Sequence, residues 1–235
     1  MNNHIAESDL QPFFSVVITT YNRAHLIKRA LKSLILQKET DWEAIVVDDE
    51  SDDDTEFQVL TFTTIYRNIS FTRQAHAGEA AAKNTGLWSA NGRFVTFLDS
   101  DDEYDKHHLE SRKSILLLNP SLKFLYGGTH IIGNHFVPDR FNINEKINLK
   151  DCVIGGTFFI ERKLFLSLTG FRNIPLGTDG DLFDRVKETG AMMQEVSLPT
   201  YIYHHETEDS ITNKMMAKQE MMLNEKTGFC NDFVS

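Results

Sequence analysis

The chain has 235 residues, of which 41% are hydrophobic and 25% are charged, and its formal net charge is −10. This composition is typical of a folded globular protein and excludes a disordered acidic chain. The negative balance disfavours a nucleic-acid partner, because the sequence shows no local basic patch to offset it. The sequence also lacks an apolar run of membrane-spanning length and a signal-peptide pattern at its start, so a cytoplasmic protein is expected. Cys152 and Cys230 are expected to be free thiols, since they are far apart and lack metal-ligand spacing.

Strands and helices alternate along the first part of the chain. The continuous apolar, β-branched run at 13–19 predicts a strand buried on both faces. Residues 26–35 repeat apolar side chains at helical spacing with basic residues opposite, which predicts an amphipathic helix. A second apolar strand at 43–49 ends in two aspartates, and a capping-box pattern at 51–54 predicts a helix that follows it.

The same alternation continues up to an acidic turn. Residues 68–74 predict a third strand, 78–90 an alanine-rich helix and 93–99 a fourth strand. This order predicts an α/β fold: a doubly wound, mostly parallel sheet with helices on both faces and its chemistry at the carboxyl ends of the strands. Asp48-Asp49 and the acidic residues of 99–102 both follow strands, so we expect them to share one crevice.

The second half of the chain is less regular. It predicts helices at 106–118, 164–169 and 181–188 and a strand at 123–128, and it contains an apolar run with two glycines at 153–160. We expect one domain over 13–205, made of a nucleotide-binding half (13–102) and an acceptor half (103–205), between a short lead (1–12) and a tail (206–235). The Met-rich amphipathic stretch of the tail at 215–223 is interpreted as core cover or a dimer contact, with a membrane-surface helix as the alternative.

Paired aspartates suggest a site for a divalent cation. Asp99 and Asp101 can present oxygen ligands to Mg²⁺ or Mn²⁺, which are commonly held by one or two carboxylates plus substrate phosphates. The alternative is an acidic turn that caps the next helix. The second acidic strand end, Asp48-Asp49, favours a cation, because two converging carboxylate clusters would otherwise repel each other.

Two further groups are candidates for chemistry. Asp181 is explained as an acid in the first turn of a helix, which leaves Asp179 available as a general base on a loop. His204-His205 follow a short apolar strand, where a neutral imidazole could complete a metal site, although a surface pair is the alternative. Phosphate-loop, dinucleotide-turn and nucleophile-elbow motifs are absent from the sequence.

These segments together resemble glycosyltransferase family 2, which has the GT-A fold. The resemblance is carried by SVVITTYNRAHLIKRALKSLILQ, WEAIVVDDESDDDT and HAGEAAAKNTGLWSANGRFVTFLDSDDEYD, and continues more weakly through GTFFIERKLFLSLTGFR and TDGDLFDRV to His205. It implies an inverting transfer of sugar from a nucleotide-sugar, most commonly a UDP-sugar, to a hydroxyl of a sugar or glycolipid acceptor. It also implies Mn²⁺ or Mg²⁺ as cofactor, and a role in polysaccharide or glycoconjugate synthesis.

The resemblance also implies residue roles. Asp179 matches the catalytic base of the family, and Asp99, Asp101 and His205 match its metal ligands. Thr178, Gly180 and Glu50 depart from the family pattern, where an acid, an aromatic residue and a glycine are usual, so Asp181 stays open as the base. The positions that match donor-binding residues are Thr19, Thr20, Tyr21, Arg23, Asp49, Lys83, Asn84, Gly86, Asp99 and Ser100.

Three rival functions remain open on sequence grounds. A metal-dependent phosphatase of the haloacid dehalogenase type also has an aspartate pair after an apolar strand, but that strand usually opens its domain. A nucleotidyltransferase would carry a glycine-rich basic loop where this chain has TTYNR. The third is a nucleotide-sugar binder without turnover, which the altered pair Thr178-Asp179 keeps open. Peripheral contact with the cytoplasmic membrane face and a homodimer also remain open.

Overall fold

A computed structural model of the chain describes residues 11–142, 145–207 and 213. These residues form two compact units, one of 11–130 and 153–203, and the other of 131–142, 145–152, 204–207 and 213. The predicted Met-rich stretch lies outside the described residues. The predicted division at residue 102 into a donor half and an acceptor half stays a prediction.

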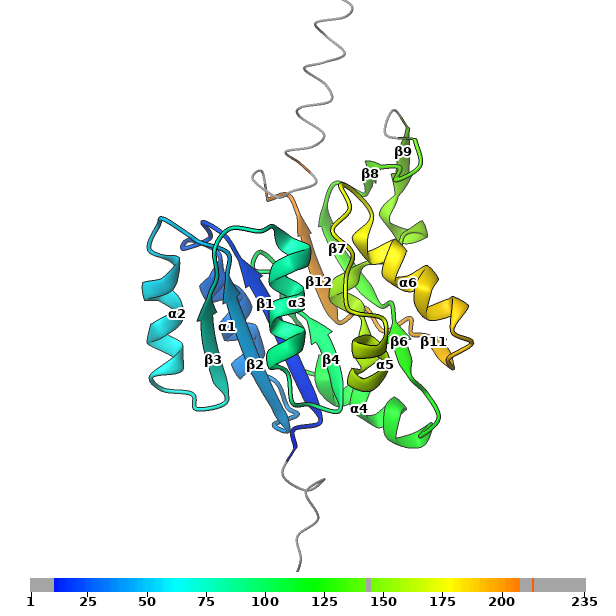
Figure 1. Cartoon of the computed structure of the whole chain (residues 1–235), viewed down its shortest axis with the longest axis horizontal. Helices are drawn as coiled ribbons and strands as arrows, with labels where there is room; N and C mark the ends of the chain where they lie inside the picture. The colour runs from blue at the N-terminus through cyan, green and yellow to red at the C-terminus, as the bar shows by residue number, and fades with distance from the viewer. Residues whose placement is uncertain (1–10, 143–144, 208–212, 214–235) are drawn as a thin grey trace, which may run out of the picture. The chain divides into compact units, whose positions relative to one another are not determined.

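The first unit is built on a mixed sheet whose strands are mostly parallel (Figure 1). β1 pairs in parallel with β2 and β4, and β2 pairs in parallel with β3. β10 runs antiparallel to β4 and β6, and β11 is parallel to β6. In the described residues the strand order is β11-β6-β10-β4-β1-β2-β3. The strands are β1 (Phe14–Thr20), β2 (Trp42–Asp48), β3 (Ile69–Arg73), β4 (Phe94–Phe97), β6 (Phe124–Tyr126), β10 (Phe159–Glu161) and β11 (Met193–Glu195).

Helices cover both faces of this sheet, as the sequence predicts (Figure 1). Successive side chains of β1 point to opposite faces, so Val16 and Ile18 join one buried cluster and Val17 joins the other. The first cluster includes residues of α1 (Ile27–Ile35), α2 (Thr55–Thr63) and α4 (His108–Leu118). The second includes residues of α3 (Glu79–Ser89), α5 (Arg162–Ser167) and α6 (Thr178–Glu188).

A glycine brings α3 against the sheet. A Cβ on Gly86 would lie 2.3 Å from Cγ1 of Val17 on β1, so a larger residue there would push the helix outward. The alanine-rich face noted in the sequence allows the same close approach, since Ala82 is fully buried. This packing fixes the position of the α3 side chains relative to the carboxyl ends of the strands.

Several boundaries differ from the predicted ones. The helix predicted from 181 starts at Thr178, so Asp179 lies in its first turn rather than on a loop, after Gly177 in a left-handed conformation (φ 78°). The apolar run at 153–160, to which the sequence assigns no element, contains the 3₁₀ turn η3 (Gly155–Thr157) and the start of the strand Phe159–Glu161. The predicted capping box is not formed: the side chain of Asp54 makes no capping bond, and Ser51 instead bonds Asp48.

Short strands complete the two units. β5 (Glu103–Tyr104) pairs antiparallel with β12 (Tyr201–His205) through Tyr201 and Ile202. β7 (Thr129–Gly133) begins in the first unit and ends in the second. Within the second unit, β8 (Phe136–Pro138) and β9 (Lys146–Asn148) form an antiparallel pair followed by the turn η2 (Leu149–Asp151).

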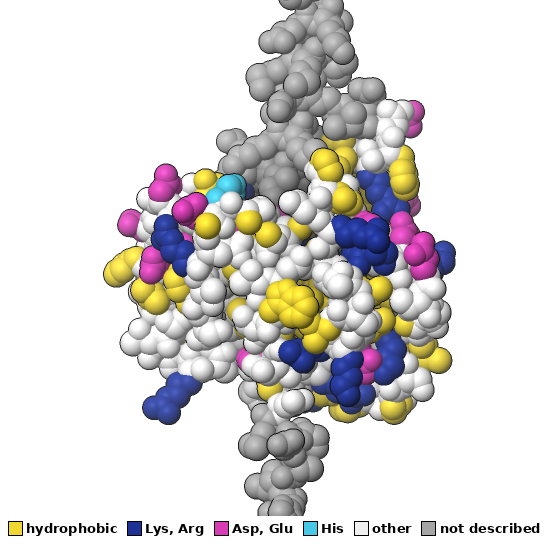
Figure 2. Space-filling model, in the orientation of Figure 1, with side chains coloured by type: hydrophobic (Ala, Val, Ile, Leu, Met, Phe, Trp, Pro, Cys, Tyr) yellow, Lys and Arg dark blue, Asp and Glu magenta, His cyan; other side chains and the backbone are white. Residues whose placement is uncertain are grey.

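The surface is mixed in charge on the face shown in Figure 2, where basic and acidic side chains are interspersed. Cys152 is a free thiol, as predicted, and Cys230 lies outside the described residues. Within residues 11–142, 145–207 and 213, no helix combines the length and the apolar character needed to cross a membrane.

Candidate active site

The acidic turn after β4 is fixed by contacts from two sides. The hydroxyl of Tyr201 donates to Asp102 Oδ2 at 2.6 Å and lies 3.3 Å from Asp99 Oδ2. On the other side, the guanidinium of Arg29 on α1 donates to the backbone carbonyl of Asp101. Asp102 is buried by these contacts, while Asp99 and Asp101 stay half-buried with their carboxylates partly accessible. The strand end therefore presents two aspartates in a fixed turn, as the sequence predicts.

Lys83 on α3 connects this turn to Asp179. Its ammonium Nζ lies 2.6 Å from Glu79 Oε1, 3.7 Å from Asp99 Oδ1 and 3.9 Å from Asp179 Oδ1. The lysine side chain is only 3% exposed, while those of the three acids are 27% to 36% exposed. A single buried cation thus draws together carboxylates from α3, the β4 turn and α6, each of which can still be reached from solvent. We call these four residues the Lys83 cluster.

The carboxylates of this region are short of positive charge. Burial raises the pKa of Asp99 to about 7, and repulsion from Glu79, Asp101 and Asp179 adds to the rise, whereas Lys83 opposes it. Burial also raises the pKa of Asp101 and that of Asp179. The surrounding acids hold the pKa of the Lys83 ammonium well above its ordinary value, so this lysine stays charged.

These carboxylates fit a divalent cation. Oδ1 of Asp179 is buried and has no hydrogen-bond partner, and a further positive charge would offset the repulsion from Glu79, Asp101 and Asp179 that adds to the raised pKa of Asp99. Asp99 and Asp101 supply the oxygen ligands that Mg²⁺ and Mn²⁺ prefer. In the part of the chain that the structure describes, no three His, Cys, Asp or Glu side chains are grouped to hold a metal ion. A cation held here would therefore need further oxygen ligands, such as those of a diphosphate.

The raised pKa of Asp99 makes a prediction for the metal-free protein. Since the pKa of folded Asp99 is about 7 against an ordinary 3.8, protonation favours the folded state. The stability that this protonation gives to the folded state is fully present below pH 3.8 and is lost as the pH rises through about 7. Urea unfolding in EDTA should therefore show that wild type loses stability relative to Asp99→Asn between these pH values. If the difference in unfolding free energy between wild type and Asp99→Asn stayed constant over this pH range, the raised pKa of Asp99 would be contradicted.

Asp179 and Asp181 face different partners in the first turn of α6. Asp179 Oδ2 accepts a hydrogen bond from the backbone N–H of Gly155 at 2.8 Å. This bond orients the carboxylate so that its other oxygen faces the Lys83 ammonium. Asp181 is ion-paired with Arg185 at 2.8 Å and with Arg172 at 3.2 Å. Asp181 thus has a structural role in the first turn of α6, as the sequence predicts, and its carboxylate is engaged by two arginines.

Asp49 anchors the loop that follows β3. Its carboxylate accepts hydrogen bonds from the backbone N–H of Ala77 and Gly78 at 2.9 and 2.8 Å, and from the side chain of Gln74 at 2.7 Å. Nδ1 of His76 lies 2.9 Å from Asp49 Oδ2. The carboxylate of Asp49 therefore orders the loop of residues 74–78, a structural role that the sequence does not reveal. Its predicted contact with a nucleotide base stays a prediction.

An exposed aromatic pair lies beside Asp49. The ring of Tyr21 contacts that of His76 with centroids 4.5 Å apart at 31°, and Tyr21 is 45% exposed. Glu50 adopts a left-handed conformation with φ 70°, which glycine adopts with less strain, and its carboxylate accepts from the backbone N–H of His76. The glutamate at this position thus helps to order the loop that carries the His76 ring.

Other predicted donor-binding residues occupy varied positions. Thr20 and Ser100 are buried and Thr19 is half-buried. Arg23 is buried on the segment after β1, where its backbone N–H donates to Thr55 and its charge opposes the rise that burial causes in the pKa of Asp101. Asn84 is different, because its side-chain amide bonds both the carbonyl and the N–H of Phe171 at 2.8 Å. Asn84 therefore ties α3 to the chain after α5, and its predicted nucleotide contact stays a prediction.

His205 belongs to the second compact unit. Its Nδ1 contacts the backbone carbonyl oxygen of Asn134 at 2.5 Å within that unit. The prediction that His205 completes the metal site stays a prediction.

Three residues of this region escape the sequence analysis. Glu79 has a local signal, since it precedes Lys83 by four residues on one helix. Tyr201 and Gly155 have none, because their partners Asp102 and Asp179 are 99 and 24 residues away along the chain. Contacts of that separation follow from the fold and not from a local pattern.

Comparisons with known proteins agree on one family. The family model for glycosyl transferase family 2 matches residues 15–114. The chain is 38% identical over 145 residues to UDP-Glc:alpha-D-GlcNAc-diphosphoundecaprenol beta-1,3-glucosyltransferase WfgD of Escherichia coli, a match that covers 60% of this chain and 56% of that protein. It is 31% identical over 161 residues to the putative teichuronic acid biosynthesis glycosyltransferase TuaG of Bacillus subtilis, covering 65% of this chain and 64% of the relative. The chain thus spans less than two thirds of these relatives.

Two solved structures share the fold. Staphylococcus aureus TarS in complex with UDP-GlcNAc is similar with a TM-score of 0.64 and 23% identity, covering 81% of this chain and 58% of TarS. The mannosyltransferase PcManGT of Pyrobaculum calidifontis, in complex with GDP-Man and Mn²⁺, is similar with a TM-score of 0.67 and 21% identity, covering 82% of this chain and 56% of that one. At these identities the likeness establishes the fold, which confirms the GT-A prediction.

Proposed function

The chain belongs to glycosyltransferase family 2 through residues 15–114, and we propose that it transfers a sugar from a nucleotide-sugar to a hydroxyl of an acceptor. The observation that carries the proposal is the Lys83 cluster, which brings Asp99 of the β4 turn and Asp179 of α6 to one ammonium group. Such a site offers ligands for a metal-bound diphosphate on one side and a carboxylate base on the other.

The proposed reaction assigns a separate role to each carboxylate. Asp99 and Asp101 would hold the divalent cation, which when bound supplies positive charge to the leaving diphosphate. Asp179 would accept the proton of the acceptor hydroxyl. The acceptor oxygen then forms a bond to the anomeric carbon while the bond from that carbon to the diphosphate oxygen breaks, and its electron pair leaves with the diphosphate. Attack opposite the leaving group inverts the anomeric centre.

The donor and acceptor classes are proposed by likeness. WfgD is named as a UDP-Glc transferase acting on a diphosphoundecaprenol-linked sugar, and a Campylobacter jejuni relative, 34% identical over 141 residues, is named for a similar lipid-linked acceptor. TarS was solved with UDP-GlcNAc, whereas PcManGT was solved with GDP-Man. We therefore propose a UDP-sugar donor and a glycolipid acceptor, in the synthesis of a polysaccharide or glycoconjugate.

Thermal unfolding with nucleoside diphosphates tests the donor site. UDP, GDP, dTDP and CDP are each added with Mn²⁺ or with EDTA. A ligand at 100 times its dissociation constant adds roughly 2.7 kcal/mol to the free energy of unfolding, which is an easily measured shift. We expect UDP with Mn²⁺ to give the largest shift and EDTA to reduce it. The absence of any shift at millimolar ligand would contradict the transferase and favour the phosphatase alternative.

Gly155→Ala is expected to lower the rate of sugar transfer while changing the melting temperature little. An added Cβ would lie 2.4 Å from Asp179 Oδ1 and would displace the proposed base. A misplacement of about 1 Å costs roughly 100-fold in rate. Initial rates and melting temperatures of wild type and variant check this prediction. A variant that keeps its full rate would show that the position of Asp179 does not matter for the reaction.

A further inference from the structure

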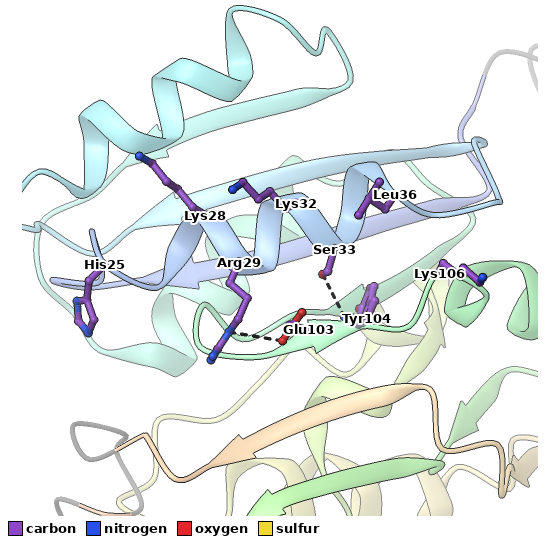
Figure 3. A pocket seen from close by; sticks show the side chains of 9 residues that line it. All are labelled: His25, Lys28, Arg29, Lys32, Ser33, Leu36, Glu103, Tyr104 and Lys106. Atoms are coloured by element: carbon purple, nitrogen blue, oxygen red, sulfur yellow. Dashed lines mark hydrogen bonds and ion pairs between the residues drawn. The ribbon is translucent and has the colours of Figure 1, made fainter.

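A concave basic surface lies on the first unit, apart from the Lys83 cluster (Figure 3). The pocket has a volume of about 460 Å³ and is lined by α1 and by the segment around β5. We call it the α1 basic pocket. One acid lines it, Glu103, which is ion-paired with Arg29 at 3.8 Å. The basic residues that line the pocket are His25, Lys28, Arg29, Lys32 and Lys106.

This surface corrects the sequence-based conclusion that no local basic patch exists. Ile27, Ala30, Leu31 and Leu34 of α1 are buried, whereas Lys28 and Lys32 on its other side are exposed. In the described part of the chain, Lys28, Lys32 and Lys106 form no ion pair, and all three are exposed. The cations are local, since the whole chain carries a net charge of −10. The basic residues of α1 are visible in the sequence opposite its apolar side chains, whereas Lys106 lies far from them in sequence and joins them only through the fold.

The chemistry of the pocket fits phosphate groups presented on a surface. Unpaired lysines attract anions, and a plane of anionic headgroups satisfies several of them at once. Leu36, directly after α1, is 68% exposed and adds an apolar group at the rim of the pocket. Burial of an exposed apolar side chain at headgroup level adds to the electrostatic attraction of basic residues for anionic lipids.

A single-stranded nucleic acid fits this surface less well. Its binding normally combines basic residues with exposed aromatic rings on which the bases stack. The aromatic side chain that lines the pocket, Tyr104, is 3% exposed and packs against the ring of His108.

We propose that the α1 basic pocket docks the protein on an anionic phospholipid surface, with a headgroup phosphate in the pocket and Leu36 at headgroup level. The proposal stands apart from the proposed sugar transfer. The docked face adjoins the acidic turn, because Arg29 both lines the pocket and donates to the backbone carbonyl of Asp101.

Co-sedimentation of the full chain with vesicles tests the docking. Vesicles of phosphatidylcholine alone are compared with vesicles of phosphatidylcholine and phosphatidylglycerol in equal parts. We expect binding to the anionic vesicles only, weakened by added salt. Each basic residue near such a surface contributes about fivefold to binding, so Lys28→Ala combined with Lys32→Ala should bind roughly 25-fold more weakly.

A matched control removes the same charge elsewhere. Lys163 on α5 and Lys187 on α6 are exposed and form no ion pair within the described residues, so their double alanine variant should bind within about twofold of wild type. Melting temperatures confirm that both variants fold.

Four results would overturn the proposal. They are equal weakening by the control variant, equal binding to neutral vesicles, no binding to anionic vesicles, and release from them by millimolar inorganic phosphate at constant ionic strength. Tight binding of a single-stranded RNA that is lost in the Lys28, Lys32 variant would instead assign the pocket to nucleic acid.

Discussion

Asp179→Asn is expected to lower the rate of sugar transfer by about 10²–10⁴-fold, the usual contribution of a general base. The substitution keeps the size of the side chain and an oxygen that can accept from the Gly155 N–H, but it removes the carboxylate that we propose accepts the proton. Binding of UDP with Mn²⁺ should change little, because the proposed ligands Asp99 and Asp101 are untouched. Release of UDP in the presence of acceptor measures the rate, and titration calorimetry measures the binding.

Asp181→Asn is the matched control. Asp181 is ion-paired with Arg185 and Arg172, so its loss should lower the melting temperature but leave most of the transfer rate. A near wild-type rate for Asp179→Asn, combined with a large loss for Asp181→Asn, would assign the base to Asp181.

Lys83→Met is expected to give the largest loss of stability in this region. The ammonium is buried among Glu79, Asp99 and Asp179, and its removal leaves their negative charges without compensation. Breaking a buried ion pair costs about 3–5 kcal/mol, and the partial exposure of the acids favours the lower end of that range. Methionine keeps the apolar stem of the side chain, so the loss should reflect charge more than packing.

The pH dependence of this loss identifies its cause. Burial and repulsion from neighbouring acids already raise the pKa values of Asp99 and Asp179, and without Lys83 these two pKa values rise further. Protonation relieves the repulsion, so the variant should lose less free energy of unfolding at pH 5 than at pH 7, measured by urea unfolding. Lys163→Met, on an exposed residue, should stay within about 0.5 kcal/mol of wild type. Equal losses at both pH values would indicate a packing defect instead.

The parallel sheet and its acidic strand ends are predictable from the sequence because both depend on local patterns. Continuous apolar runs, such as the one that becomes β1, specify strands buried on two faces. The alternation of these runs with amphipathic segments specifies helices on both sides of the sheet. The carboxyl ends of parallel strands then lie at one edge, which is enough to predict that the turn of Asp99 belongs to a site.

The contacts that define the site are not predictable in this way. The contact of Lys83 with a nucleotide stays a prediction, and the structure places its ammonium among three carboxylates from separate elements, which the sequence does not indicate. The glycine at position 155 could have been explained by backbone freedom, whereas its lack of a Cβ makes room for Asp179. Asp49 similarly uses its carboxylate to order the loop that contains Ala77 and Gly78. These roles depend on contacts between segments distant in sequence, for which local propensity gives no signal.

The most direct test of the central claim is the anomeric configuration of a transferred sugar. The donor whose nucleotide stabilises the protein is incubated with a lipid-linked diphosphate sugar acceptor, and the new linkage is assigned by NMR. The account predicts a product linked with inverted configuration, formed by wild type and lost in Asp179→Asn. A retained configuration, or no product from folded protein that binds the nucleotide, would contradict it.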